Sequence, residues 1–308
     1  MACNMKASLR APAVRRYAHG PVLAAVLMLC LAAMPARAQK AFASPEAAMQ
    51  AFGDAVATSD DDALKVMLGS NFRKLIPPLG ADARYVFLHA WSKQHSIQPA
   101  GEGRALIAAG DDGWTLPIPL VKASQGWEFD LPAGVEEMRV RRVGRNENGA
   151  MLTMQLIADA QRQYVTKDHD GDGLRVYASK LASSSGKQDG LYWPADAKIG
   201  TSPLGREFST AEALQLGPSG YNGYRFKLLT AQGPHAPGGA MDYVVRGKLY
   251  GGFGVVAWPI RYRDTGVMSF IVNHQGQVYE RDLGPDSAAK AAAMKSFDPG
   301  PGWKKVLP

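Results

Sequence analysis

The chain has 308 residues but only two cysteines, Cys3 and Cys30, and both lie before Gln39. We therefore expect no disulfide and no thiol chemistry from Gln39 onward, so that the fold must depend on its hydrophobic core. Several enzyme motifs are also missing. The chain has no G-x-S-x-G and no H-E-x-x-H, and no S-D-N or K-T-G accompanies the S-x-x-K at residues 184–187.

The chain also has little net charge outside the segment 1–38. The whole chain holds 35 Lys and Arg against 28 Asp and Glu, but the segment 1–38 contains five of the basic residues and no acidic one. That leaves 30 basic against 28 acidic residues, with no basic stripe in the sequence. We therefore expect no nucleic-acid partner.

The segment 1–38 has the pattern of a secretory signal peptide. Basic residues precede an apolar run at 21–34, and Ala36-Arg37-Ala38 follows as a cleavage site. The apolar run is short for a membrane span. We expect export to the periplasm or beyond after cleavage near Ala38, with Gln39 as the mature N-terminus and no transmembrane segment in the mature chain.

The stretch 146–173 organises the rest of the sequence. Its apolar residues recur at intervals of three and four, which predicts an amphipathic helix from Asn146 to about Val165. Lys167, Gly171 and Gly173 are typical of a helix C-terminus. We expect the apolar face of this helix to pack on the strands that follow, against Tyr224, Phe226, Phe253, Val255 and Phe270.

The pattern predicts an α+β fold: a signal peptide at 1–38, a small α+β unit at 39–143 and a second unit at 144–308. In the first unit we expect helices from Ser44, at 60–68 and at 83–95, short strands between 104 and 130, and a helix at 135–143 that ends in a linker, Gly144-Arg145. In the second unit the long helix is followed by a short helix at 174–181 and a loop-rich segment. An antiparallel meander of about five strands and a helix at 286–294 complete it.

Asp168, Asp170, Asp172 and Gly173 have the spacing of positions 1, 3, 5 and 6 of a calcium-binding loop, and the carbonyl of Leu174 falls at position 7. Ser179 stands where the bidentate acid belongs, so a ligand such as Asp189 would have to replace it. The alternative is a solvated acidic turn. Calcium is the one cofactor that the sequence suggests.

Several segments together resemble the bacterial family DUF2950. They are GLYWP at 190–194, YRFKLLTAQGP at 224–234, GGFGVVAWP at 251–259, TGVMSFIVNH at 265–274 and VYERDLGP at 278–285, with RVGRNE at 142–147 and the acidic turn at 168–173. The resemblance extends over almost the whole chain after the signal and implies a secreted or envelope protein of unknown function. It supplies no catalytic residues.

Two further resemblances concern the fold. The order of helix, acidic turn, loop and meander is similar to the head domain of type II secretion pseudopilins and pilins, although the N-terminal helix on which pilins polymerise is missing. Residues 39–143 resemble the start of an NTF2-like fold. We therefore expect a pilin-head-like second unit.

Two classes of function remain open. The first is a non-enzymatic envelope module that binds another envelope protein or a cell-wall component. The second is an envelope hydrolase whose site is assembled from distant residues such as His235 and Asp242. Loop histidines such as His235 and His274, and strand aromatics such as Trp193 and Tyr250, are more often structural than functional.

Overall fold

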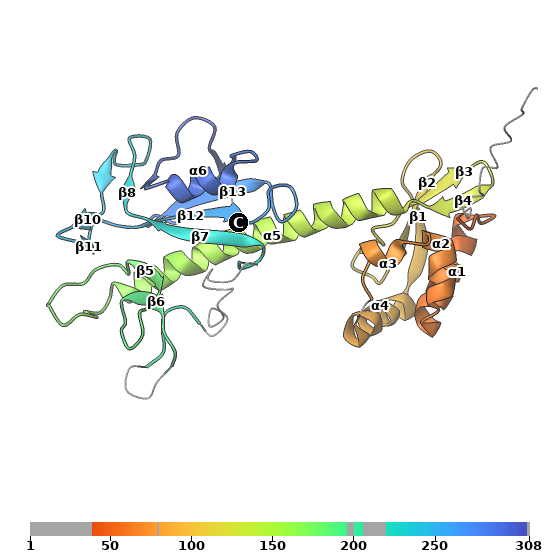
Figure 1. Ribbon diagram of the computed structural model, residues 1–308, viewed down its shortest axis with the longest axis horizontal. Coiled ribbons are helices and arrows are strands. Elements are labelled where there is room, and N and C mark those ends of the chain that lie inside the picture. The colour runs from red at the N-terminus through yellow and green to blue at the C-terminus, as the bar shows by residue number, and fades with distance from the viewer. Residues whose placement is uncertain (1–38, 79, 196–199, 206–219, 307–308) are drawn as a thin grey trace, which may run out of the picture. The chain divides into compact units, whose positions relative to one another are not determined.

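Helices and antiparallel sheets make up the computed structural model, which describes residues 39–78, 80–195, 200–205 and 220–306 (Figure 1). The α+β class and the long helix followed by a meander are confirmed. The expected signal peptide lies outside the described residues. None of the helices in the described ranges combines the length and the apolar character needed to cross a bilayer.

The first part of the chain packs four helices against a four-stranded antiparallel sheet. Ser44 caps the first helix by accepting a hydrogen bond from the backbone N–H of Ala47 at 3.2 Å, as Ser-Pro-Glu predicts. The strand 95–99 was not predicted. Tyr85 on the fourth helix is 70 % exposed. The elements are α1 (Pro45–Thr58), α2 (Asp61–Leu68), α3 (Phe72–Leu75), α4 (Ala81–Lys93), β1 (His95–Pro99), β2 (Arg104–Ala109), β3 (Leu120–Ala123) and β4 (Gly126–Phe129).

A single helix, α5 (Leu131–Tyr164), runs through the expected linker. Asp130 caps it through a hydrogen bond from the Ala133 N–H at 3.0 Å, and Pro132 occupies the first turn. The predicted helix start at Asn146 and the Gly144-Arg145 linker are therefore wrong, because both lie inside the helix. The division into units at 143/144 stays a prediction.

Gly144 provides a test of this helical continuity. It is exposed, and a Cβ built on it meets no atom within 4 Å. Gly144→Ala should therefore raise the free energy of unfolding by about 0.5–1 kcal/mol, because alanine loses less backbone entropy in a helix. Gly134→Ala is the matched control on the same helix. Its Cβ would lie 2.7 Å from Ile118 Cγ1, so that variant should be destabilised. Urea titration of both variants measures the effects. Destabilisation by Gly144→Ala would contradict a continuous helix.

The second part of the chain is built on a five-stranded antiparallel sheet, ordered β16-β14-β13-β12-β7. One face of this sheet packs on α5 and the opposite face packs on α6 (Figure 1). The predicted burial of the α5 face against the meander is confirmed, since all the named partners share one core cluster with Ile157. The elements are β7 (Tyr224–Leu229), β12 (Gly254–Pro259), β13 (Met268–Asn273), β14 (Val278–Asp282), α6 (Ser287–Ala293) and β16 (Lys304–Val306).

Two strand pairs, β5-β6 and β10-β11, and a three-stranded sheet, β15-β8-β9, accompany this sheet among the described residues. The expected helix at 174–181 is wrong, because this segment is extended and ends in a strand that pairs in parallel with residues 190–192. The additional strands are β5 (Lys180–Ala182), β6 (Gly190–Tyr192), β8 (Ala231–Gln232), β9 (Met241–Asp242), β10 (Val244–Val245), β11 (Lys248–Leu249) and β15 (Ser296–Phe297).

Candidate functional site

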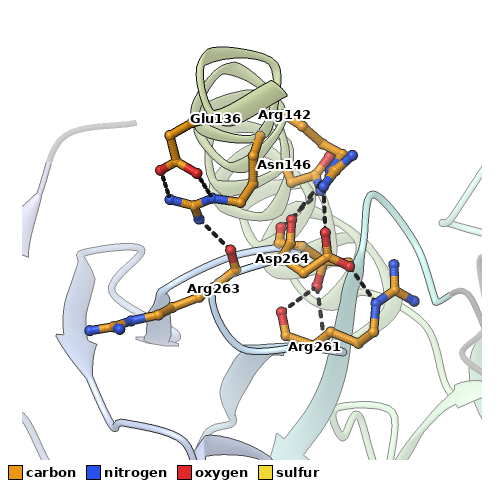
Figure 2. Close-up of polar contacts among 8 residues, drawn as sticks. Glu136, Arg142, Asn146, Arg261, Arg263 and Asp264 are labelled. Atoms are coloured by element: carbon orange, nitrogen blue, oxygen red, sulfur yellow. Dashed lines mark hydrogen bonds and ion pairs between the residues drawn. The ribbon is translucent and has the colours of Figure 1, made fainter. Parts of the chain in front are cut away.

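Helix α5 holds the loop between β12 and β13 through a set of hydrogen bonds that we call the α5 clasp (Figure 2). The Asn146 amide donates to the Thr265 carbonyl at 2.8 Å. The Glu147 carboxylate accepts the backbone N–H groups of Val267 and Met268 at 2.8 and 3.0 Å. Two of the segments that suggested the family resemblance, 142–147 and 265–274, therefore meet here.

Charged side chains extend the clasp along the helix. Arg142 and Arg261 both pair with Asp264, with Arg261 Nε 2.5 Å from Oδ2. Arg139 pairs with Glu136 and also donates to the carbonyl of Arg263. Hydrogen bonding by Arg261, supported by the charge of Arg142, lowers the pKa of the Asp264 carboxyl. The clasp therefore fixes the loop against α5 and keeps Asp264 ionised.

A cavity of about 260 Å³ opens at the C-terminal end of α5. Its walls combine aromatic rings with amide, hydroxyl and ammonium groups. The lining residues are Gln163, Tyr164, Lys167, His169, Gln188, Trp193, Gly200, Thr201 and Pro203. Among the described residues, the lining contains one lysine and no acidic residue.

Three stacked or crossed rings form the aromatic wall. The ring centroids of Tyr164 and His169 are 3.9 Å apart with an interplanar angle of 15°, and His169 meets Trp193 edge-on at 5.8 Å. Trp193 is buried and its indole N–H donates to the Gly200 carbonyl at 3.3 Å. The wall is therefore pre-formed and does not have to be assembled by a ligand.

The polar groups of this wall are already hydrogen-bonded to one another. The Tyr164 hydroxyl donates to the Gln188 carbonyl at 2.5 Å, and the His169 ring nitrogens lie 3.0 Å from the Tyr164 carbonyl and 3.2 Å from the Gln188 side-chain oxygen. Burial, with added repulsion from Asp170 and Asp189, raises the pKa of Tyr164 to about 12. Tyr164 therefore stays a neutral phenol at physiological pH.

The acidic turn lies beside the cavity, and His169 belongs to both. The Asp168 carboxylate accepts the backbone N–H groups of Asp170, Gly171 and Gly173, at 3.1, 2.8 and 2.8 Å. These bonds, that from Gly173 first, lower the pKa of Asp168. The turn is thus shaped by its own backbone, as acidic and glycine residues in turns often are.

Lys248 connects the acidic turn to the β10–β11 hairpin. Its ammonium lies 2.8 Å from Asp170 Oδ2 and also pairs with Asp172. The hydrogen bonds that Lys248 donates, the one to Asp170 first, raise the pKa of Lys248. Within the described ranges no three acidic or histidine side chains gather as a metal-ligand group. The calcium site at Asp168, Asp170, Asp172 and Leu174 remains a prediction.

Asp189, suggested as a replacement ligand for calcium, lies in another cluster. Its carboxylate pairs with Lys180 at 2.6 Å and accepts the Ser184 hydroxyl at 3.0 Å. Hydrogen bonding by Lys180 first, and then by Ser184, lowers the pKa of Asp189 to about 2. Lys180 also donates to the Ser184 hydroxyl at 2.7 Å, so that Lys180, Ser184 and Asp189 form one hydrogen-bonded cluster.

His235 has a partner that the sequence did not reveal. Its Nδ1 lies 3.1 Å from Asp298 Oδ1, and its backbone N–H donates to the same oxygen at 2.9 Å. Asp242, the acid that we expected near it, instead accepts the backbone N–H of Val244 at 2.8 Å. His235 and Asp298 are absent from the lining of the cavity beside α5.

His274 lies between aromatic rings at the end of β13. Its ring faces Tyr243 at 5.8 Å and Phe253 at 6.4 Å, and its Nδ1 is buried without a hydrogen-bond partner among the described residues. Burial lowers the pKa of His274 from its ordinary 6.5. The histidine is therefore neutral in the folded protein at pH 7.

The neutral state of His274 predicts a pH dependence of stability. Because the folded pKa is below the unfolded value, the unfolded chain binds more protons, and the contribution of His274 is lost as the pH falls below about 6.5. The free energy of unfolding should therefore fall more between about pH 7.5 and about pH 5.5 in the wild type than in His274→Gln. Urea titrations at the two pH values give the comparison. Equal losses in both proteins would contradict the lowered pKa.

Sequence reasoning found some parts of these sites and missed others. Trp193 was noticed within the segment 190–194, and it is buried as its residue type predicts, whereas Tyr250 is 61 % exposed. The stacking of Tyr164 on His169 was missed, although their spacing of five residues across a helix end was a usable signal. The pairing of Lys248 with the acidic turn was missed because 76 and 78 residues separate the partners.

A family model described as "Protein of unknown function (DUF2950)" matches residues 39–306. The match begins at the residue expected to be the mature N-terminus and ends two residues before the C-terminus. No curated protein and no solved structure matches the chain significantly. The chain therefore belongs to the DUF2950 family of proteins of unknown function.

Proposed function

We propose that this protein is an exported, non-enzymatic binding module of the cell envelope that takes a small polar group into the cavity at the end of α5. The cavity carries this proposal. It offers a pre-formed aromatic wall together with the exposed donors of Gln163, Lys167 and Thr201. Such a combination suits a polar group of another envelope protein or of a cell-wall component, with orientation set by a few polar contacts.

The hydrogen-bonding pattern favours binding over catalysis. A general base needs a free lone pair within reach of the substrate. The Tyr164 hydroxyl and the His169 nitrogens are instead engaged with Gln188 and with the Tyr164 backbone. Side chains engaged in this way hold the cavity in shape, as a binding site requires.

Thermal unfolding of the purified protein with a panel of monosaccharides, disaccharides and short peptides tests this function. A ligand that binds only the folded state raises the melting temperature by mass action. The increase should disappear in Lys167→Ala and in Thr201→Ala, which alter the lining. It should persist in Lys74→Ala, an exposed lysine on α3. If no compound raises the melting temperature, or if the increase survives both lining variants, the cavity is not the binding site.

Export is supported by the signal-peptide pattern and by the start of the family match at Gln39. Cell fractionation followed by N-terminal sequencing of the processed protein tests it. The expected result is a periplasmic or secreted protein that begins at Gln39. An uncleaved cytoplasmic protein would contradict export.

Calcium binding by the acidic turn is the cofactor proposal. Calcium would replace the Lys248 ammonium between Asp170 and Asp172 and add Asp168 and the Leu174 carbonyl as oxygen ligands. Because calcium would bind only the folded turn, the melting temperature should be higher in millimolar calcium than in chelator. Differential scanning calorimetry makes this comparison.

Two variants sharpen the calcium test. Asp170→Ala should melt at the same temperature with calcium and with chelator, because it removes a ligand. Lys248→Met should respond at lower calcium concentrations than the wild type, because no ammonium competes for the two carboxylates. Magnesium should substitute poorly, since it requires a tighter octahedral shell. If calcium has no effect on either the wild type or Lys248→Met, the turn is a solvated acidic turn.

The His235–Asp298 pair supports a second candidate, an envelope hydrolase. A carboxylate on Nδ1 orients the imidazole and leaves Nε2 to act as a base, which is two-thirds of a catalytic triad. The His235 side chain is 52 % exposed and thus accessible to substrate. Hydrolysis of chromogenic esters, amides and glycosides by the wild type, and its loss in His235→Ala, would establish this function. Turnover equal in both proteins would exclude His235 as the base.

A further inference from the structure

The fold gathers arginines that are separated in the sequence. Helix α5 carries four arginines and no acidic residue between Arg139 and Arg145. The clasp brings two more, Arg261 and Arg263, against this stretch of the helix. From Gln39 onward, the excess of basic over acidic side chains is only two. This concentration of guanidinium groups therefore differs from the nearly neutral average of the chain.

Glu136 and Glu137 pair with Arg139 and Arg141, but the acidic groups near the other four arginines do not neutralise them. Asp264 is shared between Arg142 and Arg261, whose side chains remain 47 % and 65 % exposed. Glu147 is engaged with two backbone N–H groups. Within the described residues, no carboxylate pairs with Arg145 or with Arg263. Positive charge and hydrogen-bond donors are therefore left over for a partner.

The loop that carries Arg261 and Arg263 is held rigidly. Its backbone carbonyls accept hydrogen bonds from Arg139, Arg142 and Asn146. Arg263 has φ of 64°, in the left-handed region that glycine or asparagine occupies more readily. A conformation that costs free energy, kept in place by surrounding bonds, is often found at a functional position. The guanidinium groups are thus presented with little flexibility of their own backbone.

We propose that Arg142, Arg145, Arg261 and Arg263, together called the arginine band, bind a linear polymer that carries repeated phosphate groups. The guanidinium fork binds phosphate oxygens in pairs and is more weakly hydrated than an ammonium group. Figure 2 shows Arg261 and Arg263 leaving the loop in opposite directions, so no single small anion reaches both. A chain of phosphates does reach both, by crossing the loop.

A bilayer surface fits this band less well than a polymer. Tyr262, between the two loop arginines, is half-buried, and its hydroxyl donates to Asp282 at 2.9 Å. The loop therefore has no free aromatic side chain to insert beside its charges, which stable attachment to a membrane usually adds to electrostatic attraction.

Binding of long-chain inorganic polyphosphate to the purified full chain tests the arginine band. The double variant R261Q/R263Q removes two charges but keeps polar side chains of similar length, and it leaves Arg142 in the clasp. We expect its dissociation constant to rise by about tenfold or more, with a weaker salt dependence between about 50 and about 200 mM salt. The control R84Q/R104Q removes two exposed arginines of the first part of the chain and should bind like the wild type. Far-UV circular dichroism and melting temperature verify that both variants fold.

The lysine variant R261K/R263K keeps the charge but loses the fork, so we expect binding between those of the wild type and R261Q/R263Q. Vesicles of phosphatidylglycerol should bind more weakly than polyphosphate. Four results would overturn the proposal: no polyphosphate binding by the wild type, equal weakening in R84Q/R104Q, full affinity in R261K/R263K, or tighter binding to the vesicles. Either of the first two results would exclude the arginine band as the binding site. Full affinity in R261K/R263K would exclude recognition of phosphate by the guanidinium fork. Tighter binding to the vesicles would exclude a polymer as the partner.

Discussion

Ile157→Asp is expected to unfold the second part of the chain. Ile157 is 2 % exposed and lies on the face of α5 that packs against Phe253, Val255 and the neighbouring core residues. Aspartate would forfeit about 1.5–3 kcal/mol of apolar burial and place a carboxylate in a dry core, at a cost of several kcal/mol more. The combined loss approaches the total stability of an ordinary domain, about 5–15 kcal/mol. Loss of the cooperative melting transition, followed by near-UV circular dichroism, measures this effect.

Leu156 provides the matched control for Ile157. It is the preceding residue on the same helix, but it is 45 % exposed because it faces away from the sheet. Leu156→Asp should change the free energy of unfolding by no more than about 0.5 kcal/mol, since exposed positions tolerate charge. If the two variants lost equal stability, helix propensity rather than core packing would account for the effect. An unchanged melting temperature in Ile157→Asp would contradict the packing itself.

Both halves of α5 were expected to be helical, at 135–143 and from Asn146 onward, but their continuity through 144–145 was not. From Ala150 onward the apolar residues form one stripe that packs on a single sheet, so the periodicity of the sequence reflects the burial. Before Ala150 the helix is rich in arginine and glutamate, and it contains Gly134 and Gly144. Glycine and the absence of an apolar stripe both predict an interruption. The helix begins after Asp130, whose side chain accepts the cap hydrogen bond from the Ala133 N–H. An aspartate followed by Leu-Pro is a typical helix start, so this N-cap was recognisable in the sequence.

The segment 174–181 shows how a tertiary contact overrides a local pattern. Gln161 is a buried residue of α5 that forms hydrogen bonds with both backbone groups of Ala178. Its side-chain oxygen accepts the Ala178 N–H at 2.8 Å, and its side-chain amide donates to the Ala178 carbonyl at 2.9 Å. These bonds replace those that a helix at 174–181 would make. The partner lies 17 residues away, so nothing within the segment itself indicates the extended conformation.

The candidate sites also depend on contacts between residues that are far apart in the sequence. Residues close in sequence were assigned correctly to one turn, as with Asp168 and the backbone N–H groups that it accepts. Partners far apart in sequence were missed or misassigned. His235 is paired with Asp298, 63 residues away, rather than with the nearer Asp242. The arginine band arises because the fold joins residues separated by about 120 positions, which charge counting along the sequence does not reveal.

Gly266 occupies the most crowded glycine position of the α5 clasp. A Cβ built there would lie 2.0 Å from the Tyr224 hydroxyl oxygen and 2.5 Å from its ring carbon Cζ. Tyr224 is fully buried, and its hydroxyl donates to the Met268 carbonyl at 2.8 Å. The ring therefore cannot turn aside without breaking this hydrogen bond and displacing the core around Phe270.

Gly266→Ala should therefore lower the free energy of unfolding by about 3 kcal/mol or more, at the upper end of the range for overpacked cores. Urea titration measures the loss. A double-mutant cycle with Tyr224→Leu isolates its cause, because leucine lacks the ring atoms that the new Cβ would meet. In the Tyr224→Leu background, Gly266→Ala should cost much less than it does in the wild type. Equal costs in the two backgrounds would show that the Tyr224 ring is not the cause of the loss.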